Sequence, residues 1–80
     1  MKLEFYYKPE CPYCQKVIRV IEKYKLEDKI DFKNIKEDEK HHQRLVEDGG
    51  QDMVPCLFID DQPMYESSDI VQFLKKEFVQ

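Results

Sequence analysis

Two cysteines separated by two residues are the most reactive feature of this sequence. The segment Cys11-Pro12-Tyr13-Cys14 follows an alternating apolar stretch and opens an amphipathic one, which places it at a turn from a strand into a helix. Unpaired backbone N–H groups and the helix dipole favour an anion at such a turn, and Lys8 adds a positive charge. We therefore expect Cys11 to be a thiolate near neutral pH.

The second cysteine has a different environment. Cys14 lies in the first helical turn, on the same stripe as Val17, Ile18 and Ile21, so its sulfur is expected to face inward. A low thiol pKa adds little to the rate of attack, because nucleophilicity falls with basicity, but it makes the sulfur a good leaving group. The pattern predicts rapid thiol–disulfide exchange, in which Cys11 attacks and Cys14 resolves.

Zinc binding is the alternative chemistry for these residues. Cys11 and Cys14 could be joined by Cys56 and by one of His41 and His42. A C-x-x-C motif after a strand and at a helix start is typical of redox proteins, and neighbouring histidines in a charged helix are typical of solvated surface. We therefore favour redox exchange and predict no metal site.

Hydrophobic periodicity predicts seven elements in the order strand, helix, strand, helix, strand, strand, helix. The strands are expected around Leu3, Phe5 and Tyr7, around Ile30, Phe32 and Ile35, within Val54 to Ile59 from Pro55 onward, and at Met64 to Glu66 after an Asp60-Asp61-Gln62-Pro63 turn. The helices are expected over about Pro12 to Lys25, over Glu39 to Asp48 between an Asp38 cap and Gly49-Gly50, and from a Ser67 cap through positions 70, 73, 74 and 78. This pattern predicts one α/β domain over residues 1–80.

Composition and charge exclude several classes of function. The chain has 13 basic and 17 acidic side chains, a net charge near -4, and no dense basic block, so nucleic acid is not an expected partner. The longest apolar run, Val54 to Ile59, is far short of the roughly 20 residues that cross a bilayer. Three cysteines are too few for a disulfide scaffold, and the charged N-terminus does not resemble a secretory signal. We expect a monomer in a reducing cytoplasm.

Three motifs together resemble the glutaredoxins of the thioredoxin superfamily. They are Tyr-Lys-x-x-Cys-Pro-Tyr-Cys after the first strand, Val54-Pro55 before the third, and Ser68-Asp69 at the start of the last helix. Cys-Pro-Tyr-Cys is the dithiol active-site sequence of that family, and the resemblance covers essentially the whole chain. It implies a thioredoxin-like fold, with a four-stranded mixed sheet and three helices in the order βαβαββα, and a cis Pro55 facing the cysteines.

The same resemblance implies a groove for glutathione. The Val54 backbone would bind the cysteinyl part, the start of the last helix would bind the γ-glutamyl end, and Lys8 would meet the glycyl carboxylate. Relatives often add a donor from the second helix, where this chain has His42, with Arg44 as an alternative. The residues implied for the groove are Lys8, Tyr13, His42, Val54, Pro55, Ser67, Ser68 and Asp69.

Two features depart from the glutaredoxin pattern. Tyr65-Glu66 stands where many glutaredoxins have Gly-Gly, and Met53 replaces the common threonine before Val54. The segment Glu66-Ser67-Ser68-Asp69-Ile70 instead resembles the Glu/Gln-Ser-x-x-Ile signature of the thioredoxin-like domain of glutathione S-transferases. A complete transferase also needs a helical second domain, for which 80 residues leave no room.

The resemblance implies a glutathione-dependent thiol–disulfide oxidoreductase. Its partners would be glutathionylated or disulfide-containing proteins, with glutathione as co-substrate and no permanently bound cofactor. The alternatives are an electron donor reduced by thioredoxin reductase, or a glutathione-binding module without turnover. A dimer bridged by an iron–sulfur cluster on Cys11 and external glutathione is a further alternative. Cys56 is expected to act as a small buried hydrophobe.

Overall fold

A four-stranded mixed sheet forms the centre of the molecule. The computed structural model describes residues 1–79, in which the strands are β1 (Leu3–Tyr7), β2 (Asp31–Asn34), β3 (Cys56–Ile59) and β4 (Gln62–Met64). They lie in the order β2-β1-β3-β4. The β1–β2 pair is parallel, whereas β1–β3 and β3–β4 are antiparallel.

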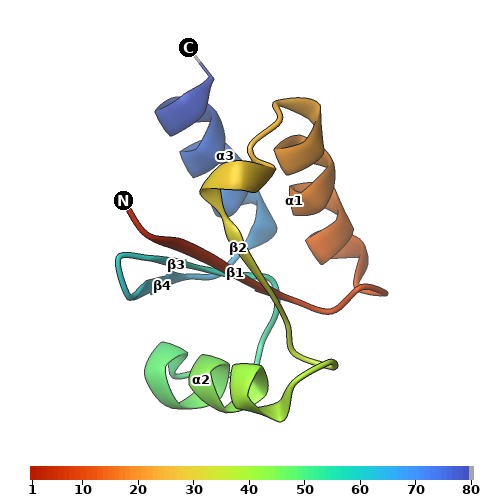
Figure 1. Ribbon diagram of the computed structural model, residues 1–80, viewed down its shortest axis with the longest axis vertical. Helices are drawn as coiled ribbons and strands as arrows, with labels where there is room; N and C mark the ends of the chain where they lie inside the picture. Colours follow the sequence, from red (N-terminus) through yellow and green to blue (C-terminus); the bar gives the residue numbers. More distant parts are fainter. Residues whose placement is uncertain (80) are drawn as a thin grey trace.

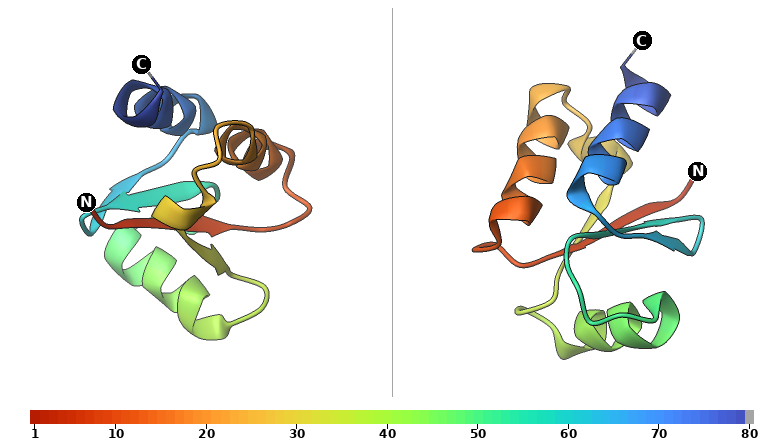
Figure 2. Two further views of the ribbon diagram at one scale, coloured as in Figure 1. Left: turned by 45° about the horizontal axis from the view of Figure 1, so that its top comes forward. Right: turned by 180° about the vertical axis from the view of Figure 1, so that it is seen from behind.

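Three α-helices cover the two faces of this sheet. They are α1 (Pro12–Lys23), α2 (Glu39–Gly49) and α3 (Ser67–Phe78), and a 3₁₀ turn, η1 (Glu27–Lys29), precedes β2. Helices α1 and α3 lie side by side on one face, and α2 lies alone on the other (Figure 1, Figure 2). No helix within residues 1–79 is long and apolar enough to cross a membrane. The predicted order of elements and the mixed sheet are confirmed.

Both faces of the sheet are buried because alternate residues of the strands point in opposite directions. Phe5 and Leu57 belong to the cluster under α1 and α3. Tyr6 and Phe58, the next residue of each strand, belong to the cluster under α2, together with Leu45 of that helix. Helix α2 therefore holds the second face of the sheet away from water.

The ends of α1 and α2 follow local backbone rules. Helix α1 has Pro12 at its first position, where the missing N–H costs nothing. It stops at Lys23, two residues before the predicted end, and the left-handed Lys25 (φ 55°) turns the chain. The Asp38 side chain caps α2 as predicted, accepting from the Lys40 N–H at 2.9 Å. Gly50 ends that helix at φ 90°, a conformation in which glycine is favoured.

The predicted boundaries between β3 and α3 need correction. Asp60 and Asp61 both have positive φ (48° and 70°) and form a two-residue hairpin turn, so β4 begins at Gln62 rather than Met64. Strand β3 begins at Cys56, one residue after the predicted start. The Ser67 cap was wrong: Ser67 is the first helical residue, Glu66 holds the cap position with φ 64°, and no side chain caps α3. The hairpin closes over fewer residues than its polar sequence suggested.

Candidate functional site

The dithiol motif lies where β1 passes into α1. Cys11 is the N-cap residue of α1, and its Sγ accepts the Cys14 backbone N–H at 3.4 Å. The Cys11 N–H donates to the Lys8 carbonyl at 3.2 Å, which closes the connecting loop. The half-buried Cys11 sulfur therefore faces the amino end of a helix, where partial positive charge favours an anion.

Cys14 is fully buried, as its position on the apolar stripe predicted. The pKa of its thiol is raised to about 12, chiefly by burial, and a hydrogen bond with Cys11 and the charge on that sulfur act in the same direction. A backbone hydrogen bond at Lys8 acts in the opposite direction. The two sulfurs are thus unequal, because one is accessible at a helix end and the other is shielded and held protonated.

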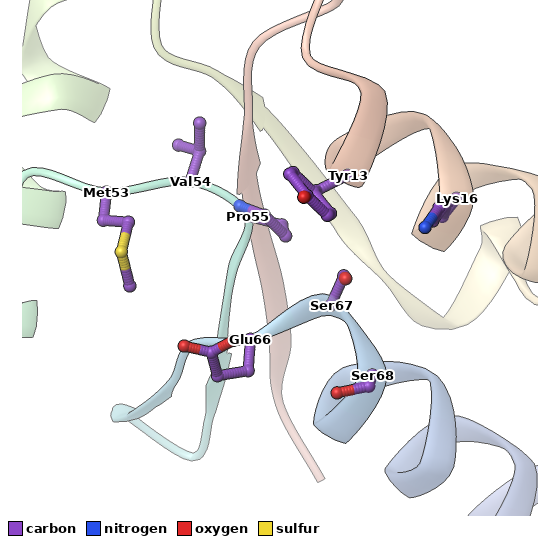
Figure 3. Close-up of a pocket in the computed structure, with 8 residues that line it drawn as sticks. All are labelled: Tyr13, Lys16, Met53, Val54, Pro55, Glu66, Ser67 and Ser68. Carbon is purple, nitrogen blue, oxygen red and sulfur yellow. The ribbon is translucent and has the colours of Figure 1, made fainter.

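A groove of about 430 Å³ begins beside the motif at Tyr13, a volume within the range of small-molecule sites. One wall comes from the segment before β3, and the other from the start of α3 (Figure 3). The lining residues are Tyr13, Lys16, Met53, Val54, Pro55, Glu66, Ser67 and Ser68. The bond between Val54 and Pro55 is cis, as the resemblance implied.

Five of the eight residues predicted for ligand binding share this groove: Tyr13, Val54, Pro55, Ser67 and Ser68. Sequence reasoning missed Lys16 as a lining residue. Its Nζ lies 5.2 Å from the centre of the exposed Tyr13 ring. The three-residue spacing from Tyr13 was the available signal, because residues three apart share one face of a helix.

The family model for glutaredoxin matches residues 3–64, which is most of the chain. The chain belongs to the glutaredoxin family. Among curated proteins, none matches the sequence.

Solved structures share the fold of this glutaredoxin-family chain. A variant of a thioredoxin-like protein has a TM-score of 0.70 and 21% identity, over 99% of this chain and 100% of that chain. The glutaredoxin from Brucella melitensis has a TM-score of 0.63 and 18% identity, over 96% of this chain and 80% of that chain. A glutathione transferase homologue from Sulfitobacter, with bound glutathione, has a TM-score of 0.73 and 17% identity. The match covers 96% of this chain and 37% of that chain. The chain has the thioredoxin-like fold and spans little more than a third of that transferase homologue.

Lys8 and His42, two further predicted ligands, lie in a separate hollow beside α2. They share it with Ile35, Lys36, Glu39 and Asp52. His42 Nε2 is 2.9 Å from Asp52 Oδ1, and Nδ1 is 3.4 Å from Glu39 Oε1. Hydrogen bonds to Asp52 and then Glu39 raise the pKa of His42 above its usual range. Both ring nitrogens therefore already face carboxylates, and binding of a glycyl carboxylate by His42 stays a prediction.

Asp69 and Arg44 lie apart from the groove. Asp69 lines another hollow with Met64, Gln72, Phe73 and Lys76, between β4 and α3. Arg44, the alternative to His42, is engaged with Glu4, Asp48 and Asp61 instead. Neither Asp69 nor Arg44 is among the residues that line the groove at Tyr13.

The third cysteine, Cys56, is fully buried at the start of β3. Burial raises the pKa of its thiol to about 11, and it packs in the cluster under α2. Residues 1–79 contain no group of three or more histidine, cysteine, aspartate or glutamate side chains that could hold a metal ion. The ligand set of the zinc alternative is therefore not assembled.

Proposed function

We propose that this chain is a glutathione-dependent thiol–disulfide oxidoreductase that acts through Cys11 and Cys14. The observation that carries the proposal is the inequality of the two sulfurs: Cys11 is accessible at a helix N-terminus, and Cys14 is buried and protonated three residues later. Membership of the glutaredoxin family supports this chemistry.

The first step is attack on a protein–glutathione mixed disulfide. The Cys11 thiolate attacks the glutathionyl sulfur, a bond forms between Cys11 and glutathione, and the protein sulfur leaves as a thiolate that takes up a proton. The thiolate of a second glutathione then attacks the bound glutathionyl sulfur. Cys11 leaves as a thiolate, and the two glutathione sulfurs are joined in oxidised glutathione. The disulfide of the substrate has thus been transferred to glutathione.

A protein disulfide requires the second cysteine. Attack by Cys11 leaves a mixed disulfide between Cys11 and the substrate, and Cys14 then attacks the Cys11 sulfur to release the substrate as a dithiol. While Cys11 is in a disulfide it carries no charge, so the charge that raises the pKa of Cys14 is gone. Cys14 becomes easier to deprotonate at the stage when it must react, and two glutathione molecules reduce the resulting Cys11–Cys14 bridge.

The groove supports glutathione as the co-substrate. Its wall before β3 presents the backbone of Val54, and its opposite wall presents Ser67 and Ser68 in the first turn of α3. No side chain caps this helix, so its first N–H groups are available to the carboxylate of a γ-glutamyl group. The bound glutathione in the Sulfitobacter transferase homologue is consistent with this choice of ligand.

Reduction of a glutathionylated peptide tests the proposal. The peptide is incubated with the protein under two conditions, once with glutathione, glutathione reductase and NADPH, and once with thioredoxin reductase and NADPH. Turnover only with the glutathione system is the expected result. Turnover only with thioredoxin reductase would instead identify an electron donor of the thioredoxin type, and binding without turnover would identify a glutathione-binding module.

A further inference from the structure

The segment between α2 and β3, residues 50–55, forms one wall of the groove and is called the groove loop here. Met53 and Val54 of this loop line the groove. The loop starts at Gly50, whose N–H still bonds to the Val46 carbonyl of α2, and then leaves regular structure until β3. Residues 51–54 belong to no helix or strand, and side chains from other segments form hydrogen bonds with Gln51 and Asp52.

Tyr65 supplies such a contact to the groove loop. Its hydroxyl accepts the Gln51 backbone N–H at 3.3 Å and donates to the Gln51 carbonyl at 3.1 Å. One hydroxyl thus satisfies both backbone groups of the same loop residue. The Tyr65 ring packs against the cluster under α2, which includes Cys56 and Phe58, and this packing anchors the hydroxyl.

Tyr65 also belongs to the chain segment that forms the opposite wall. It directly precedes Glu66, whose positive φ of 64° turns the chain into α3, and Ser67 and Ser68 follow. The backbone of Tyr65 is therefore continuous with one wall, while its side chain binds the loop of the other.

The neighbouring helix leaves room for this hydroxyl. A Cβ placed on Gly49 would collide with the Tyr65 hydroxyl and would lie 3.3 Å from the Phe58 ring. Gly50 differs, because a Cβ there meets nothing within 4 Å and its positive φ alone favours glycine. Gly49 and Tyr65 thus form a matched pair, in which the missing side chain of one makes space for the other.

The charge state of Tyr65 suits a permanent donor. Burial is the largest effect on its pKa and raises it above the ordinary value of 10.0, with the nearby Cys56 adding to the rise. The hydroxyl therefore keeps its proton, and its hydrogen bond to the Gln51 carbonyl, throughout the neutral range.

We propose that Tyr65 is a positioning residue that fixes the groove loop relative to the start of α3, and thereby sets the separation of the two walls that bind glutathione. This role rests on the proposed function. It follows from the paired hydrogen bonds to Gln51 and from the space that Gly49 leaves for the hydroxyl.

The direct test removes only the hydroxyl. Tyr65→Phe keeps the packed ring, and Gln51 is exposed, so water replaces the lost bonds at little cost to folding. Binding is measured with S-methylglutathione, which cannot react with the dithiol. We expect the Kd to rise roughly 3- to 10-fold, because the loop of the free variant occupies the binding position for only a fraction of the time, while kcat stays within roughly twofold. Tyr24→Phe, in the cluster under α1 and α3, is the matched control and leaves the Kd unchanged.

A second variant, Gly49→Ala, tests the position of the Tyr65 hydroxyl. Gly49→Ala displaces it by collision in the wild-type background, and we expect a similar loss of affinity. In the Tyr65→Phe background the colliding atom is absent, so Gly49→Ala adds little. If the changes in Kd are not additive, Gly49→Ala acts through the Tyr65 hydroxyl. If they are additive, the two substitutions act independently.

Three outcomes decide the matter. A Kd within twofold of wild type for Tyr65→Phe, or a fall in melting temperature without a change in Kd, overturns the proposal. Equal and additive losses of affinity from Gly49→Ala in both backgrounds overturn it as well.

If the wild-type protein itself does not bind S-methylglutathione, the groove assignment of the proposed function fails. Amide exchange of residues 51–53 then tests the positioning role of Tyr65, with faster exchange in Tyr65→Phe than in Tyr24→Phe supporting it and equal exchange overturning it.

Discussion

Cys11 and Cys14 stand three residues apart in sequence, yet their sulfurs experience opposite surroundings. Cys11 precedes the first helical residue and its side chain turns back to accept a backbone N–H. Cys14 is already within α1 and points into the core beside Val17. Cys11 has an extended backbone before the helix, whereas Cys14 is inside it, and this difference leaves the first residue partly exposed and the second buried.

The first prediction concerns these two residues in the glutathione assay. Cys11→Ser is expected to abolish reduction of the glutathionylated peptide, because the attacking sulfur is lost. Cys14→Ser is expected to retain much of this activity and to lose reduction of protein disulfides, since only the latter needs the second thiol. Equal loss of peptide turnover in both variants would exclude Cys11 as the sole nucleophile.

His42 couples folding stability to pH through its two carboxylate partners. The hydrogen bonds to Asp52 and Glu39 raise its pKa above the ordinary 6.5. A raised folded-state pKa means that the charged imidazole contributes stability that is fully present below about pH 6.5 and is lost as the pH rises through the folded-state value. Asp52 belongs to the groove loop, so the hydrogen bond between His42 and Asp52 joins α2 to that loop, in addition to the backbone bond from Gly50 to Val46.

The second prediction follows from that sign. The melting temperature of the wild-type protein is expected to fall between pH 6 and pH 8.5 by more than that of His42→Gln, as measured by thermal unfolding at a series of pH values. His41→Gln, which leaves His42 and both partners in place, is the control and should follow the wild type. Parallel curves for wild type and His42→Gln would show that the ion pairs do not form in solution.

At the scale of the elements, the three helices begin in three different ways. The Cys11 sulfur occupies the cap of α1, and the Asp38 carboxylate occupies the cap of α2. Helix α3 has no side-chain cap and begins after Glu66 with its first-turn groups open. Helices α1 and α3, which contribute Tyr13 and Ser67 to the groove, are thus the two without a side-chain oxygen at the cap.

The third prediction separates these helix starts by their stability effects. Asp38→Ala is expected to lower the free energy of unfolding by about 1 kcal/mol, the usual cost of losing a cap. Ser67→Ala, in contrast, is expected to change it by less than about 0.5 kcal/mol, because Ser67 forms no capping bond. Urea unfolding of both variants makes the comparison, and a loss at Ser67 as large as that at Asp38 would restore Ser67 as a cap.

At the scale of the whole molecule, Arg44 joins three parts of the chain. From α2 it reaches Glu4 of β1 at 3.2 Å and Asp61 of the β3–β4 turn at 2.8 Å. Its guanidinium also stacks 4.4 Å from the centre of the Phe58 ring. Glu4 is nearly buried, with 8% of its surface exposed, so this arginine compensates a carboxylate that has little contact with water.

The fourth prediction removes that compensation. Arg44→Met is expected to lower the free energy of unfolding by about 1 to 3 kcal/mol, because it removes the closer of the two cations that pair with Glu4 among residues 1–79 and leaves the Lys2 amine at 3.9 Å. Adding Glu4→Gln is expected to recover part of the loss, since an uncharged side chain needs no counter-ion. Denaturant unfolding of the single and double variants measures both effects, and a double variant that is less stable by the sum of the two single changes would contradict the account.

Much of the fold and part of the site follow from local patterns. The period of two in Leu3, Phe5 and Tyr7, the proline after Cys11 and the two glycines at the end of α2 are local signals, and each predicted its element. The boundaries that failed, at β4 and at the start of α3, depend on the positive φ values of Asp60, Asp61 and Glu66. Such values are uncommon for residues other than glycine, so composition gave no signal for them.

The sequence by itself determined the order of the elements, the position of the dithiol at a helix start and the burial of Cys14, because each depends on residues a few positions apart. Only the tertiary structure decided which predicted ligands meet. It placed Val54 and Ser67 across one groove, His42 in a second hollow and Asp69 on a third surface. It also revealed that Tyr65 binds the groove loop. These contacts join residues that pairing and packing of the sheet bring together, and sequence spacing carries no record of such distances.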